Sequence, residues 1–185
     1  MTALRQISVQ ALRAGEIIKR LRDLVRNRQT REELLDLNAV VHELAVLVES
    51  DARSNDVRLV IEPAPGPLQV VGDAIQLQQV MLNLVRNAID AVQSDGSERL
   101  VVLRTAHTAA GVEMSVTDRG RGVDPAVRER LFQAFATTKP EGTGLGLAIS
   151  RSIIENHGGQ LAWRPNPPRG SCFYFQLPAV KGAHP

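Results

Sequence analysis

The chain has 185 residues, of which 43% are hydrophobic and only 3% aromatic, so its length allows a core built mainly from aliphatic side chains. Its single cysteine, Cys172, excludes a disulfide framework and a cysteine-rich zinc site. We find no signal-peptide pattern and no apolar run long enough to cross a bilayer, and therefore expect a cytoplasmic chain that makes no membrane contact.

Charge is distributed unevenly along the chain. Residues 1–31 hold eight Arg or Lys residues against Glu16 and Asp23, a formal charge of +6, and the remainder carries −4. Such a basic arm is typical of binding to nucleic acid, anionic lipid or an acidic protein, and also of a simple solvated helix face. Because no aromatic residues interleave the arginines, single-stranded nucleic acid is disfavoured, and we predict no nucleic-acid partner.

The first 30 residues predict a long helix that packs on another helix. Apolar residues recur there at alternating spacings of three and four, which is a heptad pattern: Leu4, Ile7, Ala11, Ala14, Ile18, Leu21 and Val25. Residues 27–36 (NRQTREELLD) indicate a polar junction. We therefore predict a boundary near residue 30, a second domain over residues 31–180 and a tail over residues 181–185.

The second domain mixes helix and strand signals without strict βαβ alternation. Helices are predicted over residues 36–55, 73–93, 125–131 and 144–156. Strands are predicted over residues 57–62, 99–107, 111–118, 160–165 and 171–178. Asp36 or Asn38 is expected to cap the first of these helices and Asp73 the second. The mixture favours an α+β sandwich with helices on one face of a sheet.

The helix predicted over residues 73–93 carries a polar stripe among dense apolar positions. The stripe consists of Gln76, Gln79, Asn83, Arg86, Asn87 and Asp90. An ordinary solvent-exposed face is the alternative, but such faces favour Lys and Glu, and asparagines lower helix propensity. Asparagine oxygens suit a magnesium ion that also carries phosphate oxygens. The stripe is thus a candidate metal and phosphate site, with Asn83 and Asn87 side by side.

An aspartate follows the strand over residues 111–118. Asp118 ends an alternating apolar run and precedes a turn that contains Gly120 and Gly122. A turn-capping aspartate is the alternative reading. A half-buried carboxylate in a pocket would accept from the exocyclic amino group of adenine, and it would disfavour guanine, which has a carbonyl oxygen there.

The segment LFQAFATTKPEGTG, residues 131–144, is a candidate lid. Leu131, Phe132 and Phe135 can anchor one end, and the TTK sequence supplies two hydroxyls and one cation. Alone, the segment is equally typical of a flexible surface loop. Beside a phosphate site, it is interpreted as a lid.

Three glycines mark the start of the last predicted helix. Gly142, Gly144 and Gly146 leave backbone amides free at a helix N-terminus, which is an anion-binding arrangement. A Walker loop is excluded because Gly-Lys-Ser/Thr does not occur. A Rossmann fingerprint is excluded because a polar loop precedes the glycines and no acidic residue follows at the required distance.

Four motifs in this order, NLVRNA, DRGRG, FATTK and GTGLGL, resemble the ATP-binding domain of sensor histidine kinases. That domain belongs to a superfamily with gyrase, the Hsp90 chaperones and the MutL repair proteins. ALRAGEIIKRLRDLVRNR and GTGLGLAISRSIIENHGG resemble the branch of the rhizobial haem-based oxygen sensor and the nitrogen-regulatory kinases. The resemblance covers nearly the whole chain. It implies a two-layer Bergerat ATP-binding fold, a mixed sheet with three helices on one face, preceded by a long N-terminal helix.

The resemblance also implies residue roles. ATP and Mg²⁺ would be the cofactors, Asn87 the metal ligand, and Asn83 and Lys139 the catalytic residues at the phosphates. Asp118 would recognise adenine, with Ser171 beside it. The other implied ATP-binding residues are Arg86, Asp90, Gly120, Gly122, Val123, Phe135, Thr138, Gly142, Thr143, Gly144, Leu145, Gly146 and Leu147. Ala136 replaces a second aromatic residue common in relatives, which is expected to loosen the lid.

Residue 83 bears on the reaction. In the members of the superfamily that hydrolyse ATP, the resemblance implies a glutamate general base four residues before the metal-binding asparagine. An amide at Asn83 cannot take a proton from water, so transfer to a positioned acceptor is favoured over hydrolysis. An ATPase-type conformational switch and a non-catalytic interaction module remain the alternatives. An anti-sigma-type serine kinase shares the ATP motifs but is not expected to begin with a long heptad helix.

The phosphate acceptor is expected outside this chain. In the related kinases it is a histidine in a pattern like His-Glu-Leu-x-x-Pro. The HEL sequence at His42 lacks the proline and follows the heptad helix, so we reject it, and His107, His157 and His184 are poorly placed. We therefore expect a protein-histidine kinase domain that does not autophosphorylate in this form.

Residues 1–30 match the second helix of a dimerisation hairpin in these kinases. The resemblance therefore implies a homodimer through this helix region in the full-length protein. It also implies a response-regulator receiver domain as partner, and the basic arm is a candidate docking surface for the acidic face of that domain.

Overall fold

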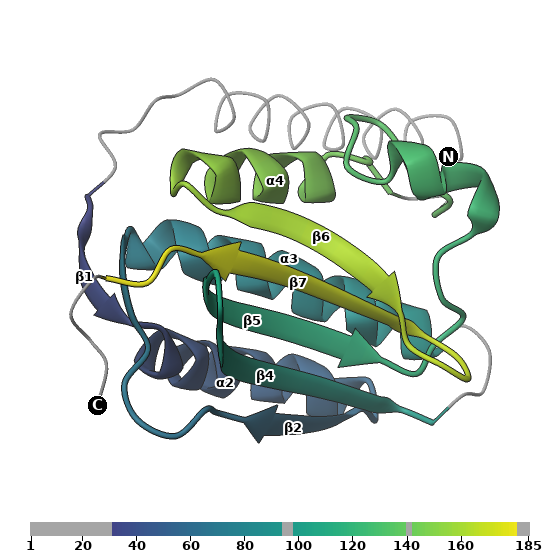
Figure 1. Ribbon diagram of the computed structural model, residues 1–185. Coiled ribbons are helices and arrows are strands. Elements are labelled where there is room, and N and C mark those ends of the chain that lie inside the picture. The colour runs from purple at the N-terminus through teal and green to yellow at the C-terminus, as the bar shows by residue number, and fades with distance from the viewer. Residues whose placement is uncertain (1–30, 94–97, 140–141, 181–185) are drawn as a thin grey trace, which may run out of the picture.

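The computed structural model describes residues 31–93, 98–139 and 142–180 (Figure 1). The heptad helix predicted over residues 1–30 and the tail over residues 181–185 lie outside the described residues. The described elements are β1 (Glu33–Asp36), α2 (Leu37–Ser54), β2 (Arg58–Glu62), β3 (Gln69–Gly72), α3 (Ala74–Gln93), β4 (Leu100–Thr108), β5 (Gly111–Asp118), a 3-10 helix (Pro125–Arg130), α4 (Gly146–Asn156), β6 (Gln160–Pro165) and β7 (Ser171–Leu177).

Five strands form the main sheet, in the order β2-β4-β5-β7-β6. β2 runs parallel to β4, and the other neighbours are antiparallel, so the sheet is mixed. The parallel pair requires a long crossover, which β3 and α3 provide. β4 and β5 form the predicted strand pair, which closes where Thr108 pairs with Gly111.

The helices cover one face of the sheet, with α3 between α2 and α4 (Figure 1). α2 contacts β2 and β4, α3 contacts β4 and β5, and α4 contacts β6. Because strand side chains alternate between faces, Val112, Met114 and Val116 of β5 all point into the core. From α3, Leu77 and Met81 are fully buried against them. This arrangement confirms the predicted α+β sandwich.

Side-chain caps fix where the first two helices begin. Asp36 Oδ1 accepts from the backbone N–H of Asn38 at 3.0 Å, so Asp36 is the cap of α2. Asn38 instead donates to the carbonyl oxygens of Ala64 and Gly66. Asp73 caps α3 as predicted, with Oδ1 accepting from two first-turn N–H groups.

Two short strands depart from the sequence predictions. Residues 33–36, predicted as part of a polar junction, form β1, and the unpredicted β3 pairs with it antiparallel. Each strand has four residues, too few to show an alternating pattern. Leu34 and Val71 face each other across this ladder and are exposed. The short helix predicted near residue 125 is a 3-10 helix, in which Asp124 caps the first turn.

Within the described ranges, no helix has both the length and the apolar character needed to cross a membrane.

Candidate functional site

A cavity of about 880 Å³ lies between α3, the start of α4, the end of β5 and the segment at residues 131–139. Its volume is in the range of cofactor sites. Many of the predicted site residues line it: Asn83, Arg86, Asn87, Asp90, Asp118, Gly122, Val123, Thr138, Lys139, Thr143, Gly144, Gly146, Leu147 and Ser171. Residues far apart in the sequence thus meet in one pocket.

Asp118 forms the buried end of the pocket and is 2% exposed. Its Oδ1 accepts from the backbone N–H groups of Gly120 at 2.8 Å and Ser171 at 3.3 Å. Burial raises the pKa of Asp118 from 3.8 to about 6, although the two backbone hydrogen bonds oppose this rise. The carboxylate is therefore held by the turn after β5 and by the start of β7 before any ligand binds.

Gly120 allows the turn after β5 to approach α3. A Cβ at this position would overlap the backbone carbonyl of Ala91. Gly120 does not itself line the cavity, but the close approach keeps Asp118 beside the pocket face of α3. A glycine is therefore required here for packing.

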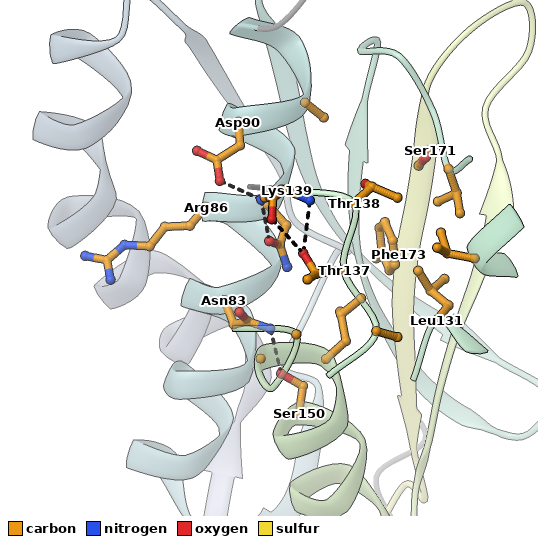
Figure 2. A pocket seen from close by; sticks show the side chains of 18 of the residues that line it. Asn83, Arg86, Asp90, Leu131, Thr137, Thr138, Lys139, Ser150, Ser171 and Phe173 are labelled. Atoms are coloured by element: carbon orange, nitrogen blue, oxygen red, sulfur yellow. Dashed lines mark hydrogen bonds and ion pairs between the residues drawn. The ribbon is translucent and has the colours of Figure 1, made fainter. Parts of the chain in front are cut away.

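The polar stripe of α3 divides between the pocket and a neighbouring helix. Asn83, Asn87 and Asp90 lie at helical spacing along the pocket side. The guanidinium of Arg86 points away from them and pairs with Asp51 of α2 at 3.4 Å (Figure 2). Arg86 therefore borders the cavity while its charge is held at α2.

Lys139 crosses the pocket mouth to α3 (Figure 2). Its Nζ donates to Asn87 Oδ1 at 3.0 Å and to Asp90 Oδ2 at 2.6 Å. The side chains of Lys139 and Asp90 are 34% and 52% exposed, so solvent screens this ion pair. The backbone N–H of Lys139 also donates to Thr137 Oγ1 at 3.0 Å. This end of the pocket is thus held together by a partly exposed lysine.

The start of α4 borders the same end of the pocket. The first-turn N–H groups of a helix have no intrahelical partners, and no side chain caps α4, so these groups remain available as donors at the predicted anion site. Gly144 has a φ of 67°, and a Cβ there would lie 2.5 Å from the backbone carbon of Phe135. Gly146 is packed against the carboxamide of Asn83. Gly144 and Gly146 thus let the start of α4 pack closely on the segment at residues 131–139 and on α3.

The residues present fit a magnesium ion that also carries phosphate oxygens. Among the described residues, no group of three or more His, Cys, Asp or Glu residues is placed to hold a metal. Asn87 Oδ1 and Asp90 Oδ2 nevertheless converge on one cationic atom, Lys139 Nζ. Mg²⁺ is commonly held by one or two protein oxygens, with phosphate and water oxygens as its remaining ligands.

Three predicted residues besides Gly120 do not line the cavity. Phe135 is 64% exposed and turned outward, and its N–H donates to the carbonyl of Gly144. Leu145 is fully buried below the start of α4. Gly142 packs against Thr137 and Lys139. These residues shape the segment at residues 131–139 and the start of α4 from outside the cavity.

Sequence reasoning missed several lining residues. Arg121 lies between the two glycines of DRGRG, and Phe173 follows Ser171 by the two-residue spacing that keeps side chains on one face of a strand. Ser150 follows Gly146 by four residues on α4, and its hydroxyl accepts from Asn83 Nδ2. Helix and strand periodicity, applied to the accepted motif residues, would have found Phe173 and Ser150.

None of the three histidines in the described part of the chain lines the cavity. His157 ends α4, where its Nε2 accepts from the backbone N–H of Asp73 and its Nδ1 donates to the carbonyl of Ile153. Nε2 therefore ties the end of α4 to the start of α3, while Nδ1 bonds within α4. His42 and His107 are exposed on α2 and β4.

Comparison with known proteins agrees with this geometry. Residues 72–181 match the model of the family described as histidine kinase-, DNA gyrase B- and HSP90-like ATPases. The sensor protein FixL of Bradyrhizobium diazoefficiens is 42% identical over 97% of this chain and 35% of its own length. The chain therefore spans about a third of that relative.

Two solved structures have the same fold. Full-length ShkA in complex with AMPPNP superposes with a TM-score of 0.78 and 27% identity, over 99% of this chain and 39% of ShkA. The histidine kinase ThkA in complex with the response regulator protein TrrA gives a TM-score of 0.74 and 26% identity, over 98% of this chain and 50% of that one. The resemblance inferred from the four motifs is confirmed. The chain belongs to the family of histidine kinase-, DNA gyrase B- and HSP90-like ATPases, and it is the catalytic ATP-binding domain of a two-component sensor histidine kinase.

Proposed function

We propose that this chain is a phosphoryl donor that binds Mg²⁺-ATP in the cavity and delivers the γ-phosphoryl group to a histidine outside this chain. The observation that carries this proposal is the pocket itself. A buried, pre-positioned carboxylate lies at one end, and two oxygens of α3 converge on a cation at the other. An adenine nucleotide has a matching polarity, with an amino group at one end and a magnesium-bound triphosphate at the other.

Asp118 would recognise the base. Its Oδ1 is occupied by the N–H groups of Gly120 and Ser171, which leaves the other carboxylate oxygen to accept from the adenine amino group. The apolar residues Leu131, Val123 and Phe173 line the same cavity and would pack against the ring. Guanine presents an acceptor where adenine presents a donor, so ATP is favoured over GTP.

Asn87, with Asp90 beside it, would hold the metal ion, which when bound neutralises charge on the phosphates. Lys139 Nζ and a metal ion need the same Asn87 oxygen. Lys139 therefore has to release Asn87 when the nucleotide binds, and its ammonium is then available to the phosphate oxygens. The free N–H groups at the start of α4 add further donors.

Asn83 favours transfer over hydrolysis. Its amide nitrogen donates to Ser150, and an amide has no basic site that can take a proton from water at neutral pH. A water molecule near the γ-phosphate would gain no general base from residue 83. The γ-phosphoryl group would then wait for an acceptor that is brought to the pocket mouth.

Partners of the full-length protein follow by analogy. Because ThkA was crystallised with a response regulator, we propose a receiver domain as the downstream partner. We also propose that this domain acts in the cytoplasm. We further propose that residues 1–30 belong to a dimerisation region, on the strength of their heptad pattern.

Incubation with Mg²⁺ and γ-labelled ATP tests the proposal. We expect no label on the isolated chain and almost no released phosphate. A separate peptide that carries the acceptor helix of a related kinase should then receive acid-labile label. Acid-labile label on the chain itself would place an acceptor within it, and rapid phosphate release would favour an ATPase switch instead.

A further inference from the structure

Ser150 contacts a proposed catalytic residue although no motif includes it. It lies in the second turn of α4 and is 2% exposed. Its hydroxyl oxygen accepts from Asn83 Nδ2 at 3.0 Å, and the two side chains face each other across the contact of α3 with α4 (Figure 2).

The opposite end of the Asn83 carboxamide is held by the same helix. Asn83 Oδ1 packs so closely on Gly146 that a Cβ on that glycine would overlap it. Gly146 and Ser150 are four residues apart, so they present one face of α4 to Asn83. The carboxamide is thus oriented with its nitrogen at Ser150 and its oxygen at the start of α4.

The reverse orientation is disfavoured at the start of α4. The first-turn N–H groups of a helix are donors without intrahelical partners, and they carry partial positive charge. An amide nitrogen placed there would meet other donors, whereas an oxygen is complementary. Ser150 favours the same orientation, because it gives the Asn83 carboxamide nitrogen a buried acceptor away from the start of α4.

A serine at this place is not explained by helix formation. Serine is a poorer helix former than alanine, and within a helix its hydroxyl commonly turns back to the carbonyl four residues earlier. Here the hydroxyl instead accepts a hydrogen bond from a side chain on another helix. The contact therefore accounts for a residue that α4 itself would not favour.

We propose that Ser150 is a positioning residue that fixes the orientation of the Asn83 carboxamide in the pocket. When the carboxamide nitrogen is bound to Ser150, the carboxamide oxygen stays at the start of α4. An oxygen there carries partial negative charge, so it favours a phosphate-bound magnesium ion over bare phosphate oxygens. This inference rests on the proposed function, since it assumes that Mg²⁺-ATP occupies the cavity. It adds a residue that governs how strongly the site distinguishes magnesium-bound from metal-free ATP.

The test measures ATP affinity of the 185-residue chain by calorimetry, with Mg²⁺ and with EDTA. The ratio of the two dissociation constants gives the magnesium enhancement. In Ser150→Ala the carboxamide can rotate, so we expect this enhancement to fall roughly three- to tenfold, the worth of one hydrogen bond. Ser150→Thr, which keeps the hydroxyl, should retain most of it. Ser152→Ala is the matched control, because Ser152 is on the same helix and does not line the cavity.

A double-mutant cycle separates positioning from general packing. If Ser150 acts through Asn83, then Ser150→Ala should change the enhancement little in an Asn83→Ala background. An unchanged enhancement in Ser150→Ala would overturn the inference, and so would equal losses of affinity with and without Mg²⁺. If Ser150→Ala does not fold, Ser150→Cys answers the same question, since it keeps the size but weakens the acceptor. Failure of the unmodified chain to bind ATP would instead overturn the proposed function.

Discussion

The two ends of the cavity are built in opposite ways. At the base end, Asp118 is buried and accepts from two backbone N–H groups, one in the turn after β5 and one at the start of β7. At the phosphate end, Lys139 and Asp90 are partly exposed, and the lysine comes from a loop. The sheet fixes the first arrangement. In the second, a flexible lysine side chain pairs with the oxygens of α3 around it.

This difference assigns separate tasks to the two ends. A buried, raised-pKa carboxylate is costly to the folded protein, and selective recognition of the base would justify that cost. An exposed lysine contact costs little to break, so it suits an end that must accept a metal and then open for an acceptor. Substitutions at the base end should therefore have the larger effects.

Replacement of Asp118 should give the largest effect on binding. Asp118→Ala removes the only predicted acceptor for the adenine amino group, and we expect a loss of about 2–5 kcal/mol in ATP affinity. The preference for ATP over GTP should disappear with it. Calorimetric titration with both nucleotides measures this change, and GTP serves as the internal control. If Asp118→Ala retained the preference for ATP, base recognition would have to reside elsewhere.

Asp118→Asn should separate stability from binding. The folded-state pKa of about 6 lies above the reference value of 3.8, so the folded protein binds the proton more tightly than the unfolded chain. The stability that Asp118 contributes is therefore present below pH 4 and is lost as the pH rises to about 6, by on the order of 3 kcal/mol. We expect Asp118→Asn to remove this pH dependence and to raise the unfolding free energy at pH 7.5, while ATP binding is lost.

Denaturant unfolding of both proteins between pH 4 and pH 8 checks that expectation. Asp56→Asn is a suitable control, because Asp56 is exposed and outside the cavity. Parallel pH profiles for the unmodified chain and Asp118→Asn would show that Asp118 does not titrate in this way.

Gly144 and Gly158 form a matched pair that sharpens the contrast at the phosphate end. Both have left-handed backbone, with φ of 67° and 68°. A Cβ at Gly144 would lie 2.5 Å from a backbone carbon of Phe135, whereas at Gly158 the nearest atom is 3.9 Å away. Both alanine variants carry the backbone strain, but Gly144→Ala should lose about 1–3 kcal/mol more and weaken ATP binding. Equal losses in unfolding free energy would show that the backbone at Phe135 can move away from residue 144 at no cost.

Lys139→Met should have the smallest effect on folding. The ion pair with Asp90 is solvent-exposed, so we expect the unfolding free energy to change by less than about 1 kcal/mol. Metal-free ATP should lose more affinity than Mg²⁺-ATP, because the lysine is then the main cation left for the phosphates. A large loss of stability would contradict the view that this contact is easily opened.

Sequence patterns predicted the fold where the elements are long. α3 and the β4–β5 pair have enough residues to show their periods, and Asp36 and Asp73 mark helix starts. β1 and β3 were missed because four residues show no period, and because their pairing joins segments separated by α2 and β2. The helices predicted over residues 36–55 and 73–93 are otherwise confirmed.

Sequence patterns predicted the candidate site only in part. The motif order located the pocket, but helical spacing could not tell that Arg86 turns toward Asp51, since a stripe on a helix faces more than one neighbour. The partners of Lys139 depend on a loop, which leaves no periodic signal. Ser150 is one polar residue within an amphipathic helix, and only the contact with Asn83 gives it a role. The roles of the site residues stay predictions until variants are measured.

A titration of the unmodified chain with ATP and with GTP, each in the presence and absence of Mg²⁺, tests the proposed roles of both ends of the cavity. We expect ATP to bind at least about tenfold more tightly than GTP, and Mg²⁺ to tighten ATP binding. Equal affinities for the two nucleotides would contradict the role of Asp118. Affinity for ATP that does not respond to Mg²⁺ would contradict the role of Asn87 and Asp90.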